Sequence, residues 1–163
     1  MVNEIKTFSE NELLNFIDNL ITSKKYDVVG PVSKGIRYAF NTLEDADEIK
    51  LDYDVTILPP KKYFLPQYED LMDYNLTKEF DVKDNLPDKK RVLIGVHPYD
   101  VIAIEQMDKV YLDDQKDDFY EKRRKNTIII AMDIQKVSDR SFAKSMKTNI
   151  IDSGFDLILT NIG

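Results

Sequence analysis

The sequence predicts an α/β protein, a single domain over residues 1–163 in which an N-terminal α+β lobe (1–88) precedes a βαβαβ unit (89–163) with a mainly parallel sheet. Two apolar runs without polar alternation, Arg91–Val96 and Thr127–Met132, have the composition of strands buried on both faces. Helical patterns separate these runs, and a third apolar run follows near the C-terminus. Strand and helix therefore alternate, as in parallel sheets joined by right-handed crossovers.

The composition is that of a globular protein with an acidic surface. The 163 residues are 42% hydrophobic and 33% charged, and a chain of this length buries roughly 70% of the surface that its unfolded form exposes. With 23 Lys and Arg against 30 Asp and Glu, the net charge is −7. Binding to a nucleic acid backbone requires a basic surface, so we expect no nucleic acid partner.

The residue types and segments that the sequence lacks exclude several kinds of site and location. The sequence has no cysteine, which excludes disulfides, thiolate catalysis and cysteinyl metal ligands. His97 is the one histidine, so a metal site built from histidines is excluded as well. No run approaches the ~18 apolar residues of a membrane span, and residues 1–10 lack the basic and apolar regions of a secretory signal. We therefore expect a cytoplasmic protein without a membrane span.

The first element is an amphipathic helix over residues 9–21. Ser9 and Glu12 have the spacing of a capping box, in which each side chain accepts a hydrogen bond from the other residue's backbone amide. Such a helix normally packs its apolar stripe on its own domain, and less often on a partner. The stripe recurs at helical spacing: Leu13, Leu14, Phe16, Ile17, Leu20 and Ile21.

Short strands are expected next. Residues 26–32 and 35–41 are rich in β-branched and aromatic side chains, with a joint at 31–34. Residues 43–50 are acidic but lack the regular carboxylates and central glycine of a calcium loop, so we expect a solvated turn or a short helix. Residues 53–58 are predicted to form another strand.

Three prolines make residues 59–67 stiff and, by our prediction, extended along the surface. With Lys61 and Lys62, this segment is a candidate to dock an anion or a partner. The simpler alternative is a rigid crossover with solvated lysines, whose apolar side chains pack on the core (Tyr63, Phe64 and Leu65).

A weaker helical pattern and a charged loop complete the first lobe. Residues 68–80 are expected to be partly helical, with three apolar side chains facing inward (Leu71, Met72 and Leu76). Residues 81–90 are charged and contain Pro87, so we expect a loop that joins the two lobes.

The second lobe alternates more regularly. After the strand Arg91–Val96 we expect a helix over 100–107 and a short apolar piece at 110–112. A second helix, 117–125, has acidic residues in its first turn and a basic run in its last, which complements the helix dipole. The strand Thr127–Met132 follows this helix.

Two further elements complete the predicted βαβαβ unit. Residues 138–146 have the pattern of a weak helix, and residues 155–162 that of a third buried strand. In such a unit the carboxyl ends of parallel strands and the amino ends of helices converge, and ligands bind there.

The turn after the strand Arg91–Val96 is therefore the candidate site. An anion there would contact two lysines of the proline-rich segment, Tyr63 and the turn itself; the candidate residues are Lys61, Lys62, Tyr63, His97 and Asp100. The sequence has no glycine-rich phosphate loop, however, since Gly95 stands alone.

Catalysis at this turn is a further hypothesis. His97 paired with Asp100 or Asp133 would make a general base. The alternative is a helix cap, in which Asp100 bonds backbone amides and His97 ends a strand. We favour the cap, because no nucleophile, metal or oxyanion loop accompanies the histidine.

Several co-linear stretches of the chain resemble a known family, the iron–sulfur electron-transfer subunits of sulfhydrogenase-type hydrogenases (their β subunit) and of anaerobic sulfite reductase. The order and spacing of the stretches agree across most of the chain. They are YDVVGPVSKGIRYAF (26–40), YDVTILPPKKYFLPQ (53–67), RVLIGVHPYDVIAIEQMDKVY (91–111), DFYEKRRKNTIIIAMDIQKVSDRSFAKSM (118–146) and GFDLILTNIG (154–163).

The resemblance also shows what this chain lacks. Family members have Pro-Cys-Asp at 98–100, Asn-Cys at 133–134 and Cys-Phe-Cys at 141–143. Four thiolates are the ligands of one 4Fe-4S cluster, so the resemblance implies a cluster site that this chain has lost as a set. The four cysteine positions carry Tyr99, Ile134, Ser141 and Ala143.

The resemblance therefore implies a cluster-less relative of an electron-transfer subunit's front domain. We expect a non-catalytic structural or docking module in or near a redox complex of anaerobic metabolism, with contact surfaces at 59–67 and 97–100. The alternative is a small-molecule or anionic cofactor-binding domain that uses the strand-end cleft. No metal or cofactor is expected here, whereas the family carries 4Fe-4S clusters.

Family members continue into a ferredoxin-like region, so this chain is expected to be either a short natural paralogue or a fragment. The oligomeric state is open, and so is enzymatic activity, with the balance against catalysis by the isolated chain.

Overall fold

The computed structural model describes residues 4–75 and 81–163. A five-stranded sheet in the order β2-β1-β5-β6-β7 forms its centre. β1 pairs with β2 in antiparallel fashion, and the pairs β1–β5, β5–β6 and β6–β7 are parallel. The strands are β1 (Asp27–Lys34), β2 (Arg37–Thr42), β5 (Arg91–Val96), β6 (Thr127–Met132) and β7 (Leu157–Leu159).

The mainly parallel α/β sheet that the sequence predicts is thus confirmed, and β5 and β6 have the predicted bounds. The sheet contains strands from both predicted lobes, because β1 lies beside β5. No helix in the described ranges is long and apolar enough to span a membrane.

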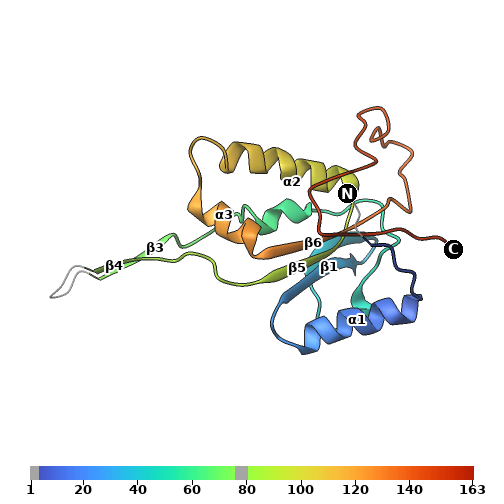
Figure 1. Cartoon of the computed structure of the whole chain (residues 1–163), viewed down its shortest axis with the longest axis horizontal. Helices are drawn as coiled ribbons and strands as arrows, with labels where there is room; N and C mark the ends of the chain where they lie inside the picture. The colour runs from blue at the N-terminus through green and yellow to red at the C-terminus, as the bar shows by residue number, and fades with distance from the viewer. Residues whose placement is uncertain (1–3, 76–80) are drawn as a thin grey trace.

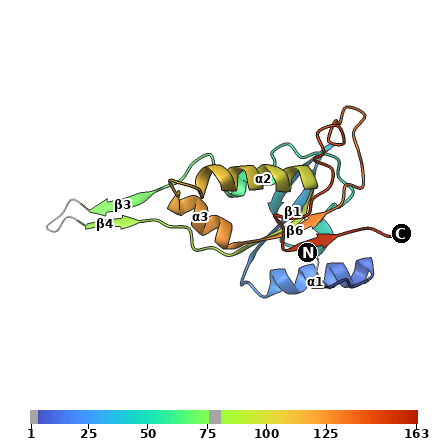
Figure 2. The same ribbon diagram turned by 45° about the horizontal axis from the view of Figure 1, so that its top comes forward.

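Helices cover both faces of the sheet (Figures 1 and 2). Helix α1 (Glu10–Thr22) lies on one face, and α2 (Pro98–Tyr111) and α3 (Asp118–Lys125) lie on the other. Successive strand residues point to opposite faces, so Leu93 joins the core beneath α2 and α3, and its neighbour Ile94 joins the core beneath α1. Because each strand face is covered, β5 and β6 are apolar after their first residues, as predicted.

Local signals account for the helix ends. Ser9 caps α1 in the predicted capping box, and the Ser9 amide donates to the Glu12 carboxylate at 2.7 Å. Asp117 caps α3 by accepting a hydrogen bond from the Tyr120 amide at 2.7 Å. Helix α2 begins earlier and ends later than predicted: Pro98 occupies its first turn, where a missing amide costs nothing, and its last turn absorbs the apolar piece at 110–112.

Strand β1 separates from β5 halfway along its length. Its parallel pairing with β5 covers Asp27 to Val29 and stops before Pro31, which has no amide to donate. The Pro31 carbonyl instead accepts from the Lys50 amide at 2.8 Å. The carboxyl ends of β1 and β5 are therefore not paired with each other. Leu51 and Tyr53 pack beside this end of β5.

Some predicted boundaries in the first lobe were wrong. Residues 31–34 are the second half of β1, and the chain turns at Gly35, whose φ of +66° suits glycine. Residues 53–58 form no strand, since the one bridge there joins Thr56 to Tyr38. The short helix expected in 43–50 is confirmed as a 3₁₀ turn, η1 (Ala46–Glu48).

The proline-rich segment 59–67 is less extended than predicted. It contains a 3₁₀ helix, η2 (Pro60–Tyr63), which begins with a proline, the position at which this residue fits a helix. Phe64 is fully buried in the core, as the crossover alternative expects. Lys62 is not simply solvated, because its ammonium donates to the Phe40 carbonyl at 2.7 Å.

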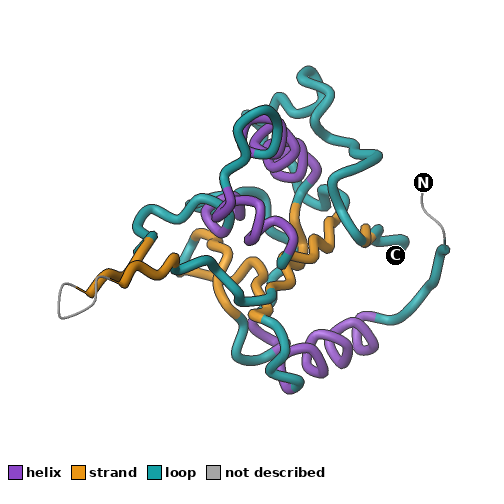
Figure 3. Tube along the Cα trace, turned by 60° about the vertical axis from the view of Figure 1, so that its left-hand side comes forward, coloured by secondary structure: helices purple, strands orange, loops and turns teal. Residues whose placement is uncertain are grey.

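A hairpin replaces the predicted partial helix and loop. Strands β3 (Met72–Asn75) and β4 (Asp81–Asp84) pair in antiparallel register and project from the body (Figures 1 and 3). Leu71 and Met72 are exposed rather than inward-facing, since nothing in the described chain covers them. Leu76, the third predicted inner residue, lies outside the described residues.

The second crossover also differs from the prediction. Residues 138–146 form turns and no helix, so the loop from β6 to β7 has no regular structure. The predicted strand 155–162 is reduced to the three residues of β7, and Leu157 is 52% exposed. One helix-containing crossover, from β5 to β6, is thus present, and a long loop stands in place of the other.

Candidate functional site

The turn after β5 is tightly closed by its neighbours. Gly95 has a φ of +78°, which favours glycine, and a Cβ added there would lie 2.9 Å from Leu51 Cδ2, so the Leu51 side chain would have to shift. The Tyr53 hydroxyl donates to the Gly95 carbonyl at 2.8 Å. The chain itself therefore occupies the place beside the strand end where related architectures hold ligands.

His97 is fully buried against this tyrosine. The imidazole stacks on the Tyr53 ring, with centroids 4.0 Å apart and planes 7° apart. Its Nδ1 lies 2.6 Å from the Tyr99 hydroxyl oxygen, and the same hydroxyl donates to the Asp54 carbonyl at 3.0 Å. Because a carbonyl only accepts, the single proton of Tyr99 goes to Asp54, and Nδ1 of His97 carries the proton donated to Tyr99.

This assignment fixes the state of the second ring nitrogen. Nε2 of His97 is left unprotonated, and it has no hydrogen-bond partner among the described residues. Burial lowers the pKa of His97 from its ordinary 6.5 to about 4, so the imidazole is neutral near pH 7.

Asp100 lies in the first turn of α2 and is also buried. Burial raises the pKa of its carboxyl to about 7, and the nearby Lys61 cation partly opposes this rise. Within the described ranges no side-chain hydrogen bond joins His97 to Asp100 or to Asp133, and the Asp100 backbone amide donates to the His97 carbonyl at 3.0 Å in the first turn of α2. Asp133 accepts instead from the Thr160 hydroxyl at 2.6 Å. The geometry of a carboxylate-oriented general base is therefore not formed here.

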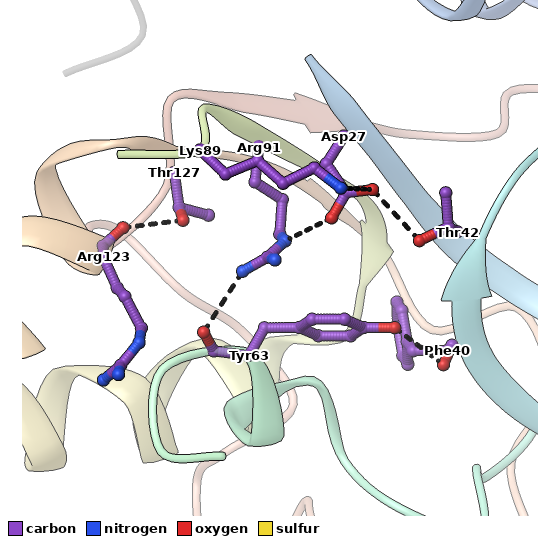
Figure 4. A network of polar contacts seen from close by, with 8 residues as sticks. All are labelled: Asp27, Phe40, Thr42, Tyr63, Lys89, Arg91, Arg123 and Thr127. Carbon is purple, nitrogen blue, oxygen red and sulfur yellow. Dashed lines mark hydrogen bonds and ion pairs between the residues drawn. The ribbon is translucent and has the colours of Figure 1, made fainter. Parts of the chain in front are cut away.

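The remaining candidate anion ligands point elsewhere (Figure 4). The Tyr63 hydroxyl donates to the Phe40 carbonyl at 2.9 Å, the same acceptor that Lys62 uses. The Tyr63 backbone carbonyl accepts from Arg91, whose guanidinium lies 4.7 Å from the Tyr63 ring centroid. Of the five candidate residues, the structure thus brings Lys61, His97 and Asp100 to one end of β5, and holds Lys62 and Tyr63 in other contacts.

A charged network that the sequence analysis missed ties these strands together (Figure 4). The buried Asp27 carboxylate accepts from Arg91 and Thr42 and pairs with Lys89, each at 3.0 Å. Burial alone would raise the pKa of Asp27, but the two cations bring it below its ordinary value. Asp27 and Arg91 begin two adjacent parallel strands in register. A charged residue at the start of each apolar run was therefore the sequence pattern from which this ion pair could have been predicted.

The four family cysteine positions carry no metal ligand set. The Tyr99 hydroxyl is hydrogen-bonded to Asp54 and His97. Ile134 and Ala143 have no side-chain atom that can bind a metal, and Ser141 is exposed. In the described ranges, no group of three or more His, Cys, Asp or Glu side chains is placed to hold a metal ion. The donor chemistry of an iron–sulfur cluster, thiolate sulfur, does not fit these residues.

Asp54 links two of the segments that carry those positions. Its backbone carbonyl holds Tyr99, and its carboxylate oxygen Oδ1 accepts from the Ser138 amide at 3.2 Å. Ser138 begins the turn that carries Ser141, whose amide donates to the Ser138 carbonyl at 2.9 Å. The segments that bear the family's first and later cysteines are therefore joined in this chain through one aspartate.

The fold and this site define an α/β protein with a mainly parallel sheet whose strand-end turn is packed by the chain's own aromatic side chains. The chain is 38% identical over 132 residues to "Sulfhydrogenase 2 subunit beta" of Pyrococcus furiosus, a match that covers 81% of this chain. It is therefore related to the family of that subunit. The chain spans 38% of the length of this relative. No protein-family profile matches the chain, and no solved structure matches it.

Proposed function

We propose that this chain is a non-catalytic, cluster-less structural or docking module of a cytoplasmic redox complex. The observation that carries the proposal is the combination of the 38% identity to a hydrogenase subunit with a sequence that has no cysteine. The identity extends over 81% of this chain, while the ligands that the resemblance implies are absent. A module of this kind contributes shape and contacts rather than electrons.

The contacts of Tyr99 and Asp54 support this proposal. In the family, a cluster would connect the turn after β5 with the loop after β6 through cysteine ligands. Here the Tyr99 hydroxyl and the Ser138 amide both bind Asp54, and so connect the same two segments by hydrogen bonds. The two segments are thereby held together without a metal.

An iron assay tests the proposal directly. The chain, purified and reconstituted anaerobically with iron and sulfide, is expected to bind no stoichiometric iron and to show no visible absorbance. A matched positive control restores the four thiolates together: Tyr99→Cys, Ile134→Cys, Ser141→Cys and Ala143→Cys. A stoichiometric cluster in the natural sequence would contradict the proposal. Failure of the four-cysteine variant alone would show that these positions do not form one site.

A second candidate function is the binding of an anionic small molecule at the amino end of α2. The observation that favours it is the Lys61 cation beside Asp100 in the first turn of α2, where helix amides and a positive charge suit an anion. A thermal-shift screen of nucleotides and flavins tests it, because a ligand that binds the folded state raises the melting temperature. The matched control is Lys61→Gln, which is expected to abolish any such shift. No shift with any compound would reject this candidate.

A further inference from the structure

The loop between β6 and β7 is basic, whereas the chain as a whole is acidic. Residues 136–150, which we name the basic loop, carry four cations against the single acid Asp139, in a chain whose net charge is −7. All four cationic residues are exposed, and none forms an ion pair with a described residue. The four are Lys136, Arg140, Lys144 and Lys147.

Large apolar side chains alternate with these cations and are equally exposed. Phe142 is 69% exposed and Ile150 is 70% exposed, with Val137 and Met146 close behind. A single exposed apolar residue on a surface needs no explanation, whereas several gathered on one loop indicate an interaction site.

The basic loop has a defined shape although it contains no helix or strand. Turn hydrogen bonds run from the Met146 amide to the Phe142 carbonyl at 3.0 Å and from the Thr148 amide to the Ala143 carbonyl at 2.9 Å. Asp54 anchors its beginning to the body. In Figures 1 and 2 the loop stands away from the helices (orange to red). A long connection without regular structure in a compact domain is usually either a functional loop or a disordered linker, and the turn hydrogen bonds and the Asp54 anchor favour the functional loop.

We propose that the basic loop is the docking surface of this module, and that its occupant is a protein surface with an apolar groove flanked by carboxylates. The inference rests on the proposed function, which supplies the need for a partner. Cations around exposed aromatic and aliphatic side chains match such a groove in charge and in polarity. The surfaces expected from sequence are less suited, because His97 is fully buried and Lys62 is bound to Phe40.

A protein partner explains the loop better than a membrane does. Segments that lie on anionic bilayers are usually amphipathic helices with one continuous apolar face, and the basic loop has no helix. The rest of the chain carries a net negative charge, so an anionic bilayer would repel those acidic groups that come within a Debye length of it. A groove on a partner protein, by contrast, needs to be complementary in charge and polarity only to the basic loop.

Zero-length crosslinking of the native complex tests the proposal. The chain is tagged in its own cells, purified anaerobically with its partner and treated with a carbodiimide, which joins lysines to carboxylates. We expect crosslinks from Lys136, Lys144 and Lys147 to Asp or Glu of the co-purified chain. Crosslinks confined to other faces would overturn the assignment of the loop and leave the proposed function standing. Absence of any co-purified chain would overturn both.

Reversing the charge of lysines in the basic loop, and of lysines elsewhere as a control, distinguishes a role of this loop from a general effect of net charge. Lys136→Glu, Lys144→Glu and Lys147→Glu together are expected to lower the recovered partner about tenfold or more. The matched control reverses three exposed lysines elsewhere (Lys24, Lys25 and Lys83) and is expected to recover the partner in full. Equal losses in both variants would contradict the proposal.

An apolar pair of variants and a lipid assay complete the test. Phe142→Ser is expected to weaken recovery, while Ile36→Ser, at a side chain 98% exposed, is expected to leave it unchanged. Both changes lie at the surface, and thermal unfolding checks that each variant folds. Vesicles containing phosphatidylserine are expected not to bind the chain. Vesicle binding that disappears in the Lys136, Lys144 and Lys147 variant would assign the loop to membranes and refute the protein partner.

Discussion

Replacement of Asp100 by Asn should uncover a pH dependence of stability that the natural chain conceals. Burial lowers the pKa of His97 to about 4, so between pH 6.5 and 4 the unfolded chain takes up a proton that the folded chain excludes. This difference makes the free energy of unfolding fall as pH falls. Burial raises the pKa of Asp100 to about 7, so over nearly the same range the folded chain keeps a proton that the unfolded chain loses. That difference makes stability fall as pH rises.

The two effects oppose each other with equal slopes. A difference of one bound proton changes the free energy of unfolding by about 1.4 kcal/mol per pH unit. In the natural chain the contributions of His97 and Asp100 nearly cancel between pH 4.5 and 6.5. Asp100→Asn removes one of them, so the variant should gain about 2 kcal/mol of stability from pH 4.5 to pH 6.5, because the slope is below its full value near the folded and unfolded pKa values of His97. Carboxylates whose pKa is lowered, such as Asp27, titrate below this window.

Urea denaturation at pH 4.5, 5.5 and 6.5 measures these slopes. The natural chain should be nearly flat, Asp100→Asn should rise with pH, and the complementary variant His97→Gln should fall with pH. Asn resembles the protonated carboxyl in size and polarity, so Asp100→Asn is expected to fold. A flat profile for Asp100→Asn, or a steep one for the natural chain, would refute the view that both groups are held neutral by burial.

Three further predictions concern stability and are checked by urea denaturation at pH 7. Ser9→Ala removes the cap of α1 and should cost about 1 kcal/mol, and no change would mean that the capping box is not formed in solution. Gly95→Ala should cost more than Gly35→Ala, because both positions have positive φ but only at Gly95 would the new Cβ press on a neighbour, the Leu51 side chain; equal costs would contradict the close packing at Gly95. Tyr99→Phe leaves two hydrogen-bonding groups without the hydroxyl and should cost about 1–3 kcal/mol, so an unchanged midpoint would argue against the bond to His97.

The parts of the fold that follow from local pattern were predictable. β5 and β6 are apolar runs with clear ends, and α1 and α3 carry capping residues at their first turns, so their positions follow from the sequence alone. The second crossover was not predictable in this way. Its apolar residues have helical spacing, but they face solvent, and turn hydrogen bonds set its shape.

The candidate site depended on contacts between distant residues. The sequence places His97 and Asp100 at a strand end, and the structure agrees on their position. It does not reveal that Tyr53, 42 residues before Gly95, closes the turn, or that Asp54 binds Ser138 across 84 residues. These partners were assigned to a strand that does not form, because Tyr53 and its neighbours have high β-propensity. Tertiary packing overrides that preference here.

The Tyr53 side chain, stacked on His97, occupies the space at the end of β5 that a ligand would need. A ligand there would have to displace a buried phenol ring, its hydrogen bond to Gly95 and the stacking contact. Together these contacts are worth about 4 kcal/mol. Displacing them would weaken the apparent affinity of any such ligand by about a thousandfold. Recognition by this chain is therefore favoured on its outer surface, where binding requires no prior opening of the core.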